Sequence, residues 1–323
     1  MGGIAIGTGT SLTTVTITAD AIAERLAEYT RQADGALSPN TVRAIRADTA
    51  LFMTWCGERD LVALPAFPET VAAFVDAMAD SRKPATVRRY VASVAHLHRA
   101  AGLDDPSKGG AVRLALKRLG RQHGARQDQA APLGELAVER VLATTGDTLI
   151  DRRDLALVMV ARDMLARRSE VVALQVEDVR FADDGTATVL VRRSKTDTAG
   201  EGAVLWLSPR TTATLRRWLD GAGVTTGPLF RSVGKGGAVG GALDAGDVAR
   251  RFKVLAERAG LDPVSISGHS ARVGMAQDLV AHGAELPAVM VAGRWKSPTM
   301  PARYAERLSA GRGAVAQYYG RRG

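Results

Sequence analysis

The sequence predicts a mainly α-helical protein built from two domains. Its 323 residues are about twice the length of a typical single domain, so two hydrophobic cores are expected. Apolar residues recur at helical spacing along most of the chain, and one stretch around residue 180 alternates as strands do. A polar, glycine-containing segment, residues 120–134, separates the two halves and is the predicted domain boundary.

The composition indicates a partner that carries negative charge. Lys and Arg exceed Asp and Glu by nine, and most of the basic residues are Arg, which binds phosphate oxygens in a bidentate way. The chain contains no apolar run long enough for a membrane span, and its N-terminus lacks the basic flank of a signal peptide. Cys56 is the single cysteine, which excludes an internal disulfide and a cysteine-based metal cluster and fits a reducing cytoplasm.

The first half reads as helices from residue 20 to residue 118. Ser38 is a candidate N-cap, with Pro39 at the first helical position. A second helix, residues 83–102, ends at Gly102. The expected buried positions follow a spacing of three and four residues: Val42, Ile45, Thr49, Phe52 and Cys56 in the first helix, and Val87, Val91, Val94 and either Leu97 or His98 in the second.

Basic side chains fall on other faces of these helices and on the segment that follows them. The stretch from Pro106 to Gln127 contains six Lys or Arg and no carboxylate. Such a stretch is either a solvated surface or a strap along a phosphate backbone, and composition alone leaves both readings open. The candidate contacts to a polyanion are Arg43, Arg46, Lys83, Arg88, Arg89, Lys117, Arg118 and Arg121.

The second half is predicted to be helical except for one β meander. Residues 176–181, 186–192 and 203–207 form three antiparallel strands, with Asp184 and Gly185 in the first turn. Lys195 lies in the loop between the second and third strands. Helices resume after the meander and run to the end, interrupted by a glycine-rich loop at residues 234–246. This loop is not a phosphate-binding P-loop, because Lys235 is followed by Gly.

Side chains at helical spacing indicate a site for a phosphate group. His269 and Arg272 are three residues apart at a predicted helix start, where both can face an anion near the free N–H groups. Arg167 and Glu170 have the same spacing. Trp295 and Tyr304 follow downstream, nine residues apart. No one of these pairs is specific, since each has a structural alternative in the core or in an ion pair.

In these segments the chain resembles the tyrosine recombinases, the phage integrase family, and the resemblance runs through nearly its whole length. It is densest in "SGHSARVG", in "ARRSEVVALQVEDV" and in "AGRW", which is followed at the family's distance by a tyrosine. The order Arg, Glu, Lys, His, Arg, Trp, Tyr makes the resemblance specific. It implies a tyrosine recombinase fold, with a SAM-like core-binding bundle before a mostly helical catalytic domain.

The resemblance also implies roles for individual residues. Carried over by position, Tyr304 is the nucleophile, Arg167 and Arg272 clamp the scissile phosphate, and His269 and Trp295 make further phosphate contacts. Lys195 is the general acid, and Glu170 supports the site. Arg168 stays an alternative partner for Glu170. Tyr318 and Tyr319 are alternative nucleophiles in principle, although we expect them to pack.

The implied activity is site-specific recombination of double-stranded DNA without a cofactor or metal. As in the family, a 3′-phosphotyrosyl intermediate and a Holliday junction are expected, with a homodimer on each inverted-repeat site and a homotetramer in synapsis. The alternatives are a dimer resolvase or phage integrase with the same site, or a catalytically silent DNA-binding relative. The expected organisation is a tail (1–18), a DNA-binding bundle (19–119), a basic linker (120–134) and a catalytic domain (135–323) whose last helix docks on a neighbouring subunit.

Two positions depart from the family's pattern. Pro301 lies three residues before Tyr304 and cannot donate a helical hydrogen bond, so the helix of the tyrosine is expected to begin or bend there. Gly246 stands where a relative has a base-reading arginine, so the DNA sequence recognised is expected to differ.

Overall fold

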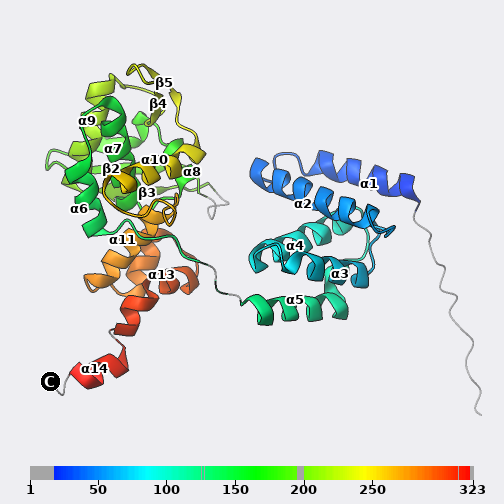
Figure 1. The fold of residues 1–323 in the computed structure, drawn as a ribbon. Coiled ribbons are helices and arrows are strands. Elements are labelled where there is room, and N and C mark those ends of the chain that lie inside the picture. Colours follow the sequence, from blue (N-terminus) through cyan, green and yellow to red (C-terminus); the bar gives the residue numbers. More distant parts are fainter. Residues whose placement is uncertain (1–17, 125, 127, 195–199, 312, 321–323) are drawn as a thin grey trace, which may run out of the picture. The chain divides into compact units, whose positions relative to one another are not determined.

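The chain divides into two compact units, residues 1–127 and residues 128–323 (Figure 1). The computed structural model describes residues 18–124, 126, 128–194, 200–311 and 313–320, and each unit is considered by itself. The division falls inside the segment predicted as the linker. Residues 1–17 of the predicted tail lie outside the described residues.

The N-terminal unit is a helical bundle around an aromatic core. The ring of Phe74 contacts those of Phe52, Trp55 and Tyr90, with centroid distances of 5.1, 5.3 and 6.1 Å. All four side chains are buried. The helices of this unit are α1 (Ala19–Gln32), α2 (Pro39–Gly57), α3 (Pro68–Ala79), α4 (Pro84–Ala100), the 3₁₀ turn η1 (Pro106–Lys108) and α5 (Gly110–His123).

Local signals place these helices where the sequence predicts them. Ser38 caps α2, and its side chain accepts a hydrogen bond from the amide of Thr41 at 3.2 Å. In α4 the fourth buried position is His98, whereas Leu97 is half-buried. The imidazole of His98 accepts a hydrogen bond from the amide of Ala66 at 2.9 Å, which explains why a polar residue occupies this core position.

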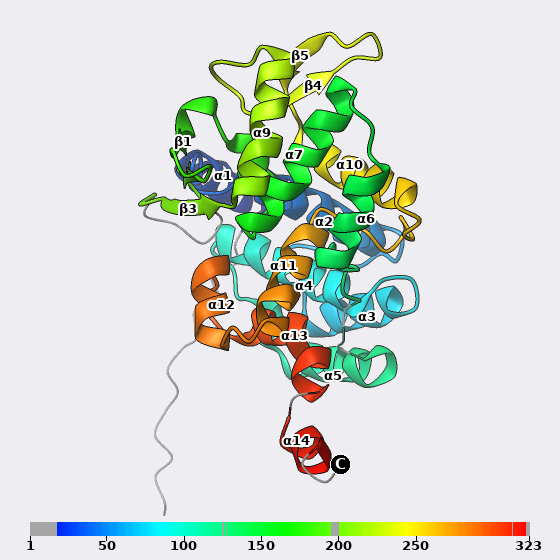
Figure 2. The same cartoon turned by 90° about the vertical axis from the view of Figure 1, so that its left-hand side faces the viewer.

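The C-terminal unit is built around helix α7 (Leu149–Asp163), most of whose residues are buried. Figure 2 shows α9 beside α7, and α11 to α13 gathered at one end of the unit. The other helices are α6 (Glu135–Thr144), α8 (Arg168–Ala173), η2 (Val176–Asp178), α9 (Pro209–Ala222), α10 (Ala245–Arg258), α11 (Ser270–Ala281), α12 (Leu286–Gly293), α13 (Thr299–Gly311) and α14 (Ala314–Gly320).

The predicted meander is present as an antiparallel sheet in the order β1-β2-β3, but its first strand is shorter than predicted, because residues 176–178 form the 3₁₀ turn η2. Gly185 has a φ of +84° in the first turn, a conformation that favours glycine. Within β2, Val189 pairs with Val179 and Leu205, and alternate residues are buried. The strands are β1 (Val179–Phe181), β2 (Ala187–Val191) and β3 (Ala203–Leu207).

A second antiparallel pair corrects the prediction that the glycine-rich segment is only a loop. Strands β4 (Arg231–Val233) and β5 (Val239–Ala242) pair with an irregular register. The pair is anchored where the amide of Leu243 donates to the carbonyl of Phe230 at 2.9 Å. Both strands are short and β5 contains two glycines, so their sequence carries little strand propensity.

The predicted linker, residues 120–134, is structured at both ends. At its start, α5 continues to His123. At its end, Leu133 is fully buried and exchanges backbone contacts with α11, since its amide donates to the carbonyl of Ser270 at 2.9 Å. A Cβ atom on Gly274 would lie 2.2 Å from the carbonyl oxygen of Leu133, so only glycine allows this approach. In the part of the chain that the structure describes, no helix is long and apolar enough to cross a membrane.

Candidate active site

The start of α8 brings Arg167 and Glu170 together. Glu170 is buried, and its carboxylate accepts a hydrogen bond from the backbone amide of Arg167 at 3.0 Å. The guanidinium of Arg167 forms an ion pair with the same carboxylate at 2.6 Å. Arg168 is exposed, and its stem lies over Gly268 instead. The geometry therefore makes Arg167 the partner of Glu170.

Arg272 is buried on the first turn of α11, where its guanidinium is held by backbone carbonyls. It donates to the carbonyl of Leu165, just beyond the end of α7, and to the carbonyl of Gly293 at 2.5 Å. Carbonyls at helix ends carry partial negative charge and therefore stabilise the buried cation. These two bonds fix the plane of a group that has five N–H donors.

The turn after α12 shapes one wall of the site. The ring of Trp295 lies under the guanidinium of Arg272, with 4.1 Å between Cζ and the ring centroid. The same ring meets Tyr304 edge-on, at a centroid distance of 5.9 Å and an interplanar angle of 67°. A Cβ atom on Gly293 would lie 1.9 Å from the Trp295 ring, so glycine is required here.

Tyr304 lies on α13, which begins at Thr299, two residues before Pro301. The prediction that this helix begins near the proline is confirmed, and the missing amide hydrogen bond costs nothing in a first turn. The backbone carbonyl of Tyr304 accepts a hydrogen bond from the side chain of Gln277 on α11 at 2.9 Å. The half-buried tyrosine is thus fixed to the helix that carries Arg272.

Desolvation by the surrounding protein, and then the positive charge of the site, lowers the pKa of His269. This residue is the N-cap of α11, so the prediction that it stands at a helix start is confirmed. Its side chain is exposed at the surface, but the protein atoms packed around it displace part of its water, which disfavours the charged form and lowers the pKa. The charges of Arg272, Arg168 and Arg167 lower it further. The lowered pKa favours the neutral imidazole at pH 7, which donates a hydrogen bond from one ring nitrogen and accepts one at the other.

Arg272 is also shifted by its neighbours. Burial, and then the charge of Arg167, lowers its pKa to about 10, while the charges of Glu170 and Tyr304 raise it. The guanidinium stays protonated at neutral pH. A cluster of arginines with a single buried carboxylate leaves excess positive charge, and such a cluster binds an anion such as a phosphate.

The structure thus brings six of the seven predicted catalytic residues into one site: Arg167, Glu170, His269, Arg272, Trp295 and Tyr304. The seventh, Lys195, lies outside the described residues. One further residue was missed from the sequence. Arg294 forms a second ion pair with Glu170 at 2.5 Å, and no spacing pattern pointed to it.

The alternative tyrosines lie on α14, at the end of the described chain. Tyr318 and Tyr319 are 51% and 68% exposed, and their rings contact each other at a centroid distance of 5.1 Å. Figures 1 and 2 show that α14 extends beyond α13, so the expected packing of these rings stays a prediction that concerns a neighbouring subunit.

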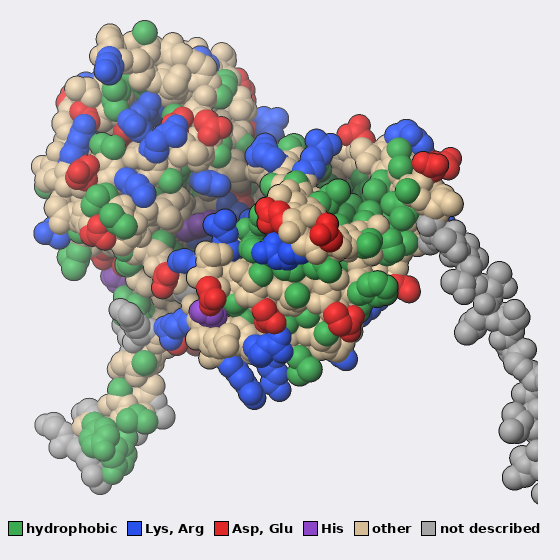
Figure 3. Space-filling view, turned by 45° about the vertical axis from the view of Figure 1, so that its right-hand side comes forward, with side chains coloured by type: hydrophobic (Ala, Val, Ile, Leu, Met, Phe, Trp, Pro, Cys, Tyr) green, Lys and Arg blue, Asp and Glu red, His purple; other side chains and the backbone are tan. Residues whose placement is uncertain are grey.

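The predicted polyanion contacts of the N-terminal unit differ in their surroundings. All eight side chains are exposed, and Figure 3 shows Lys and Arg gathered at the end of this unit where α5 lies. Arg89 is nevertheless paired with the buried Asp48 at 2.8 Å, and Arg118 is paired with Asp76 at 2.5 Å. Because Asp48 is buried while the Arg118–Asp76 pair is exposed to water, Arg89 is the one of these two that we expect to support the fold.

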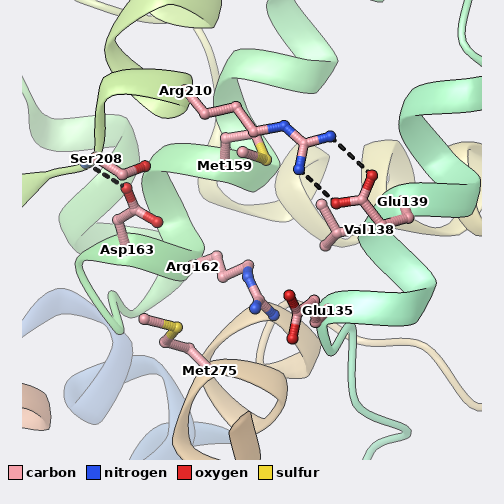
Figure 4. A pocket seen from close by; sticks show the side chains of 9 residues that line it. All are labelled: Glu135, Val138, Glu139, Met159, Arg162, Asp163, Ser208, Arg210 and Met275. Carbon is pink, nitrogen blue, oxygen red and sulfur yellow. Dashed lines mark hydrogen bonds and ion pairs between the residues drawn. The ribbon is translucent and has the colours of Figure 1, made fainter. Parts of the chain in front are cut away.

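A separate pocket of about 160 Å³ lies between α6, α7 and α9 (Figure 4). Its charges are satisfied within the chain: Arg210 pairs with Glu139, and the carboxylate of Asp163 accepts from the amide of Ser208 at 2.8 Å. Among the described residues, no three His, Cys, Asp or Glu side chains are grouped as metal ligands. The arginine cluster remains the candidate site.

Residues 133–310 match the phage integrase family. The chain belongs to this family. An integrase/recombinase xerD homolog of Selenomonas ruminantium is 32% identical over 288 residues, 85% of this chain and 84% of that protein. The recombinase Cre of Escherichia phage P1 is 27% identical over 321 residues, 93% of each chain.

Solved structures share the fold. The Tn1549 transposon integrase in complex with transposon right end DNA has a TM-score of 0.63 at 14% identity, covering 90% of this chain and 98% of that one. A λ integrase dimer bound to a COC′ core site has a TM-score of 0.58 at 15% identity, covering 88% and 76%. The mainly helical fold predicted from the sequence is confirmed.

Proposed function

We propose that this protein is a site-specific recombinase that cuts and rejoins double-stranded DNA through a covalent bond to Tyr304. One observation carries the proposal: Arg167 and Arg272, on separate helices, meet beside His269 and the tyrosine. Family membership supports it, since the XerD-like and Cre relatives are recombinases. The excess of nine basic residues over acidic ones fits a DNA partner. We propose that the protein acts in the cytoplasm, where its DNA lies.

In the proposed reaction, the phenolic oxygen of Tyr304 attacks the scissile phosphorus and loses its proton to water. A bond forms between phosphorus and the tyrosyl oxygen, and the bond to the 5′ oxygen breaks. Negative charge grows on the non-bridging oxygens, where the guanidinium groups of Arg167 and Arg272 stabilise it. The two arginines supply in this reaction the positive charge that a metal ion would otherwise supply. Rejoining needs no ATP, because the 3′-phosphotyrosyl bond conserves the energy of the phosphodiester.

The leaving 5′ oxygen takes up a proton as the bond breaks. Lys195, which follows β2 and precedes β3 in the sequence, is the proposed donor. Rejoining runs the same steps in reverse with a 5′ hydroxyl from a second DNA, which exchanges strands through a Holliday junction. Two protomers on each inverted-repeat site and four in the synapse would hold the DNA ends together.

The end of the chain is the proposed contact between protomers. Val315, Tyr318 and Tyr319 on α14 are all exposed, and together they offer an apolar face to a neighbouring subunit. Deleting residues 309–323 should therefore weaken assembly on a two-site DNA more than binding to a half-site. Equal losses in the two assays would argue against this contact.

Trapping of the covalent intermediate tests the proposed function. The protein is mixed with nicked duplexes that carry randomised inverted repeats, so that the short fragment is lost after cleavage and the adduct accumulates. Protein linked to a DNA 3′ end, absent in Tyr304→Phe, would support the proposal, and sequencing the trapped DNA would give the site. Retention of the library without any adduct would favour a catalytically silent DNA-binding protein.

A further inference from the structure

Arg294 has an unusual backbone conformation for its residue type. It caps the C-terminus of α12 with φ of +56° and ψ of +43°, in the left-handed region that glycine adopts most easily. A side chain with a Cβ atom is strained there. Gly293, immediately before it, and Trp295, immediately after it, both contact Arg272. The strained residue therefore lies at the centre of the turn that builds the site.

The side chain of Arg294 shares one carboxylate with Arg167. Its guanidinium bonds one oxygen of Glu170 at 2.5 Å, while that of Arg167 bonds the other oxygen at 2.6 Å. Glu170 is 2% exposed and Arg294 is 13% exposed, so both charges are largely removed from water. The Nε atom of Arg294 is buried and has no hydrogen-bond partner among the residues that the structure describes. Such an arrangement is costly, and folding stability alone gives little reason to keep it.

The shared carboxylate sets how strongly Arg167 is held. Three guanidinium groups, those of Arg167, Arg272 and Arg294, influence one another around a single carboxylate, that of Glu170. Without Arg294, the full charge of Glu170 would be paired with Arg167 alone. That pair would then be tighter, and Arg167 would have less of its charge and fewer of its donors available for a phosphate.

We propose that Arg294 is a positioning residue for DNA cleavage. It binds one carboxylate oxygen of Glu170, so that Glu170 holds Arg167 less tightly and the guanidinium of Arg167 remains available to bind the scissile phosphate. This role rests on the proposed function and extends it to a residue that contacts no reacting atom. A purely structural role, as a tie between the turn after α12 and the start of α8, is the alternative.

The test compares Arg294→Gly with the unaltered full-length protein in single-turnover cleavage. The substrate is the nicked duplex recovered by trapping, at a protein concentration that saturates binding. Glycine removes the guanidinium and relieves the left-handed backbone, so the melting temperature should change little. The cleavage rate should fall by about 10- to 100-fold, the usual effect of a displaced catalytic group. Asp60→Gly, at a left-handed residue of the N-terminal unit, is the matched control and should cleave normally.

A double variant separates positioning from structure. If Arg294 acts by sharing the charge of Glu170, then Glu170→Gln should recover part of the lost rate in the Arg294→Gly background, because a neutral amide holds Arg167 less tightly. A rate for Arg294→Gly within threefold of the unaltered protein, or a double variant slower than Arg294→Gly, would overturn the inference. Failure of the unaltered protein to form any adduct would instead refute the proposed function.

Discussion

The guanidinium of Arg272 is stacked on the ring of Trp295, with 4.1 Å between Cζ and the ring centroid. The stack combines a cation–π attraction with packing of two buried or half-buried groups. Because the same ring meets Tyr304, one tryptophan fixes both a predicted phosphate ligand and the predicted nucleophile. The position of this ring is therefore critical for the site.

Gly293→Ala should damage the fold and the site together. The added Cβ atom would lie 1.9 Å from the Trp295 ring, which must move away from Arg272. Overpacking of this kind costs about 1–3 kcal/mol of unfolding free energy. Chemical denaturation measures that loss, and adduct formation should fall as well. Gly311→Ala, in α13 where nothing lies within 4 Å, is the control and should leave stability unchanged or slightly higher. Equal stabilities for the two variants would contradict the account.

Arg89 and Arg88 should differ in stability although both are predicted to contact DNA. Arg89 pairs with the buried carboxylate of Asp48, and within the described part of the chain Ser93 is the only other side chain that bonds this carboxylate. Arg89→Ala should cost about 1–3 kcal/mol, the penalty of a buried acceptor left partly unsatisfied. Arg88→Ala, at an exposed position, should change stability by less than about 0.5 kcal/mol. A stable Arg89→Ala protein would show that the pair does not support the fold.

Stability should fall in mild acid because of His98. Burial lowers the pKa of this histidine, and its Nε2 accepts the amide of Ala66, so the folded state requires the neutral form. The unfolded chain binds a proton near pH 6.5, so the contribution is complete above that pH and is lost as pH falls through 6.5 toward the folded pKa. Urea titrations from pH 7.5 to 5 measure the slope. His98→Gln should flatten it, with a remainder from His96 and His269, whose pKa values are also lowered. An unchanged slope would exclude His98 as the source.

The proposed role of Lys195 predicts a specific rescue. Lys195→Ala should slow cleavage of an ordinary duplex, because the leaving 5′ oxygen then lacks its proton donor. A 5′-thio leaving group needs no proton, so the variant and the unaltered protein should cleave that substrate at similar rates. If the thio substrate is cleaved as slowly as the ordinary one by the variant, lysine has another role.

Patterns that act over a few residues predicted most of the fold. Three such features are the cap at Ser38, the proline at the start of α13 and the turn at Gly185. Each depends on residues that are adjacent in the sequence, so a local pattern is enough to predict it. The pairing of β4 with β5 could not be found in this way. Its strands are three and four residues long, and they are fixed by contacts such as Leu243 with Phe230.

The site residues that match the order of the family motif were predicted from the sequence. Residues that join the site only through contacts in the folded chain were missed. The order of Arg167, Glu170, His269, Arg272, Trp295 and Tyr304 is visible along the chain. The contact of Arg294 with Glu170 joins residues 124 positions apart, and it depends on a left-handed backbone that arginine seldom adopts. The pairing of Arg89 with Asp48 was likewise invisible, because a basic helix face looks the same whether or not a buried acid lies beneath it.

The most direct test of the central claim is to identify the residue that carries DNA in a trapped adduct. The adduct is digested with nuclease and protease, and peptide mass spectrometry locates the remaining nucleotide. We predict that the nucleotide is attached to Tyr304, and that Tyr304→Phe binds the same DNA without forming an adduct. Attachment to Tyr318 or Tyr319, or an adduct that persists in Tyr304→Phe, would contradict the assignment of the arginine cluster as the active site.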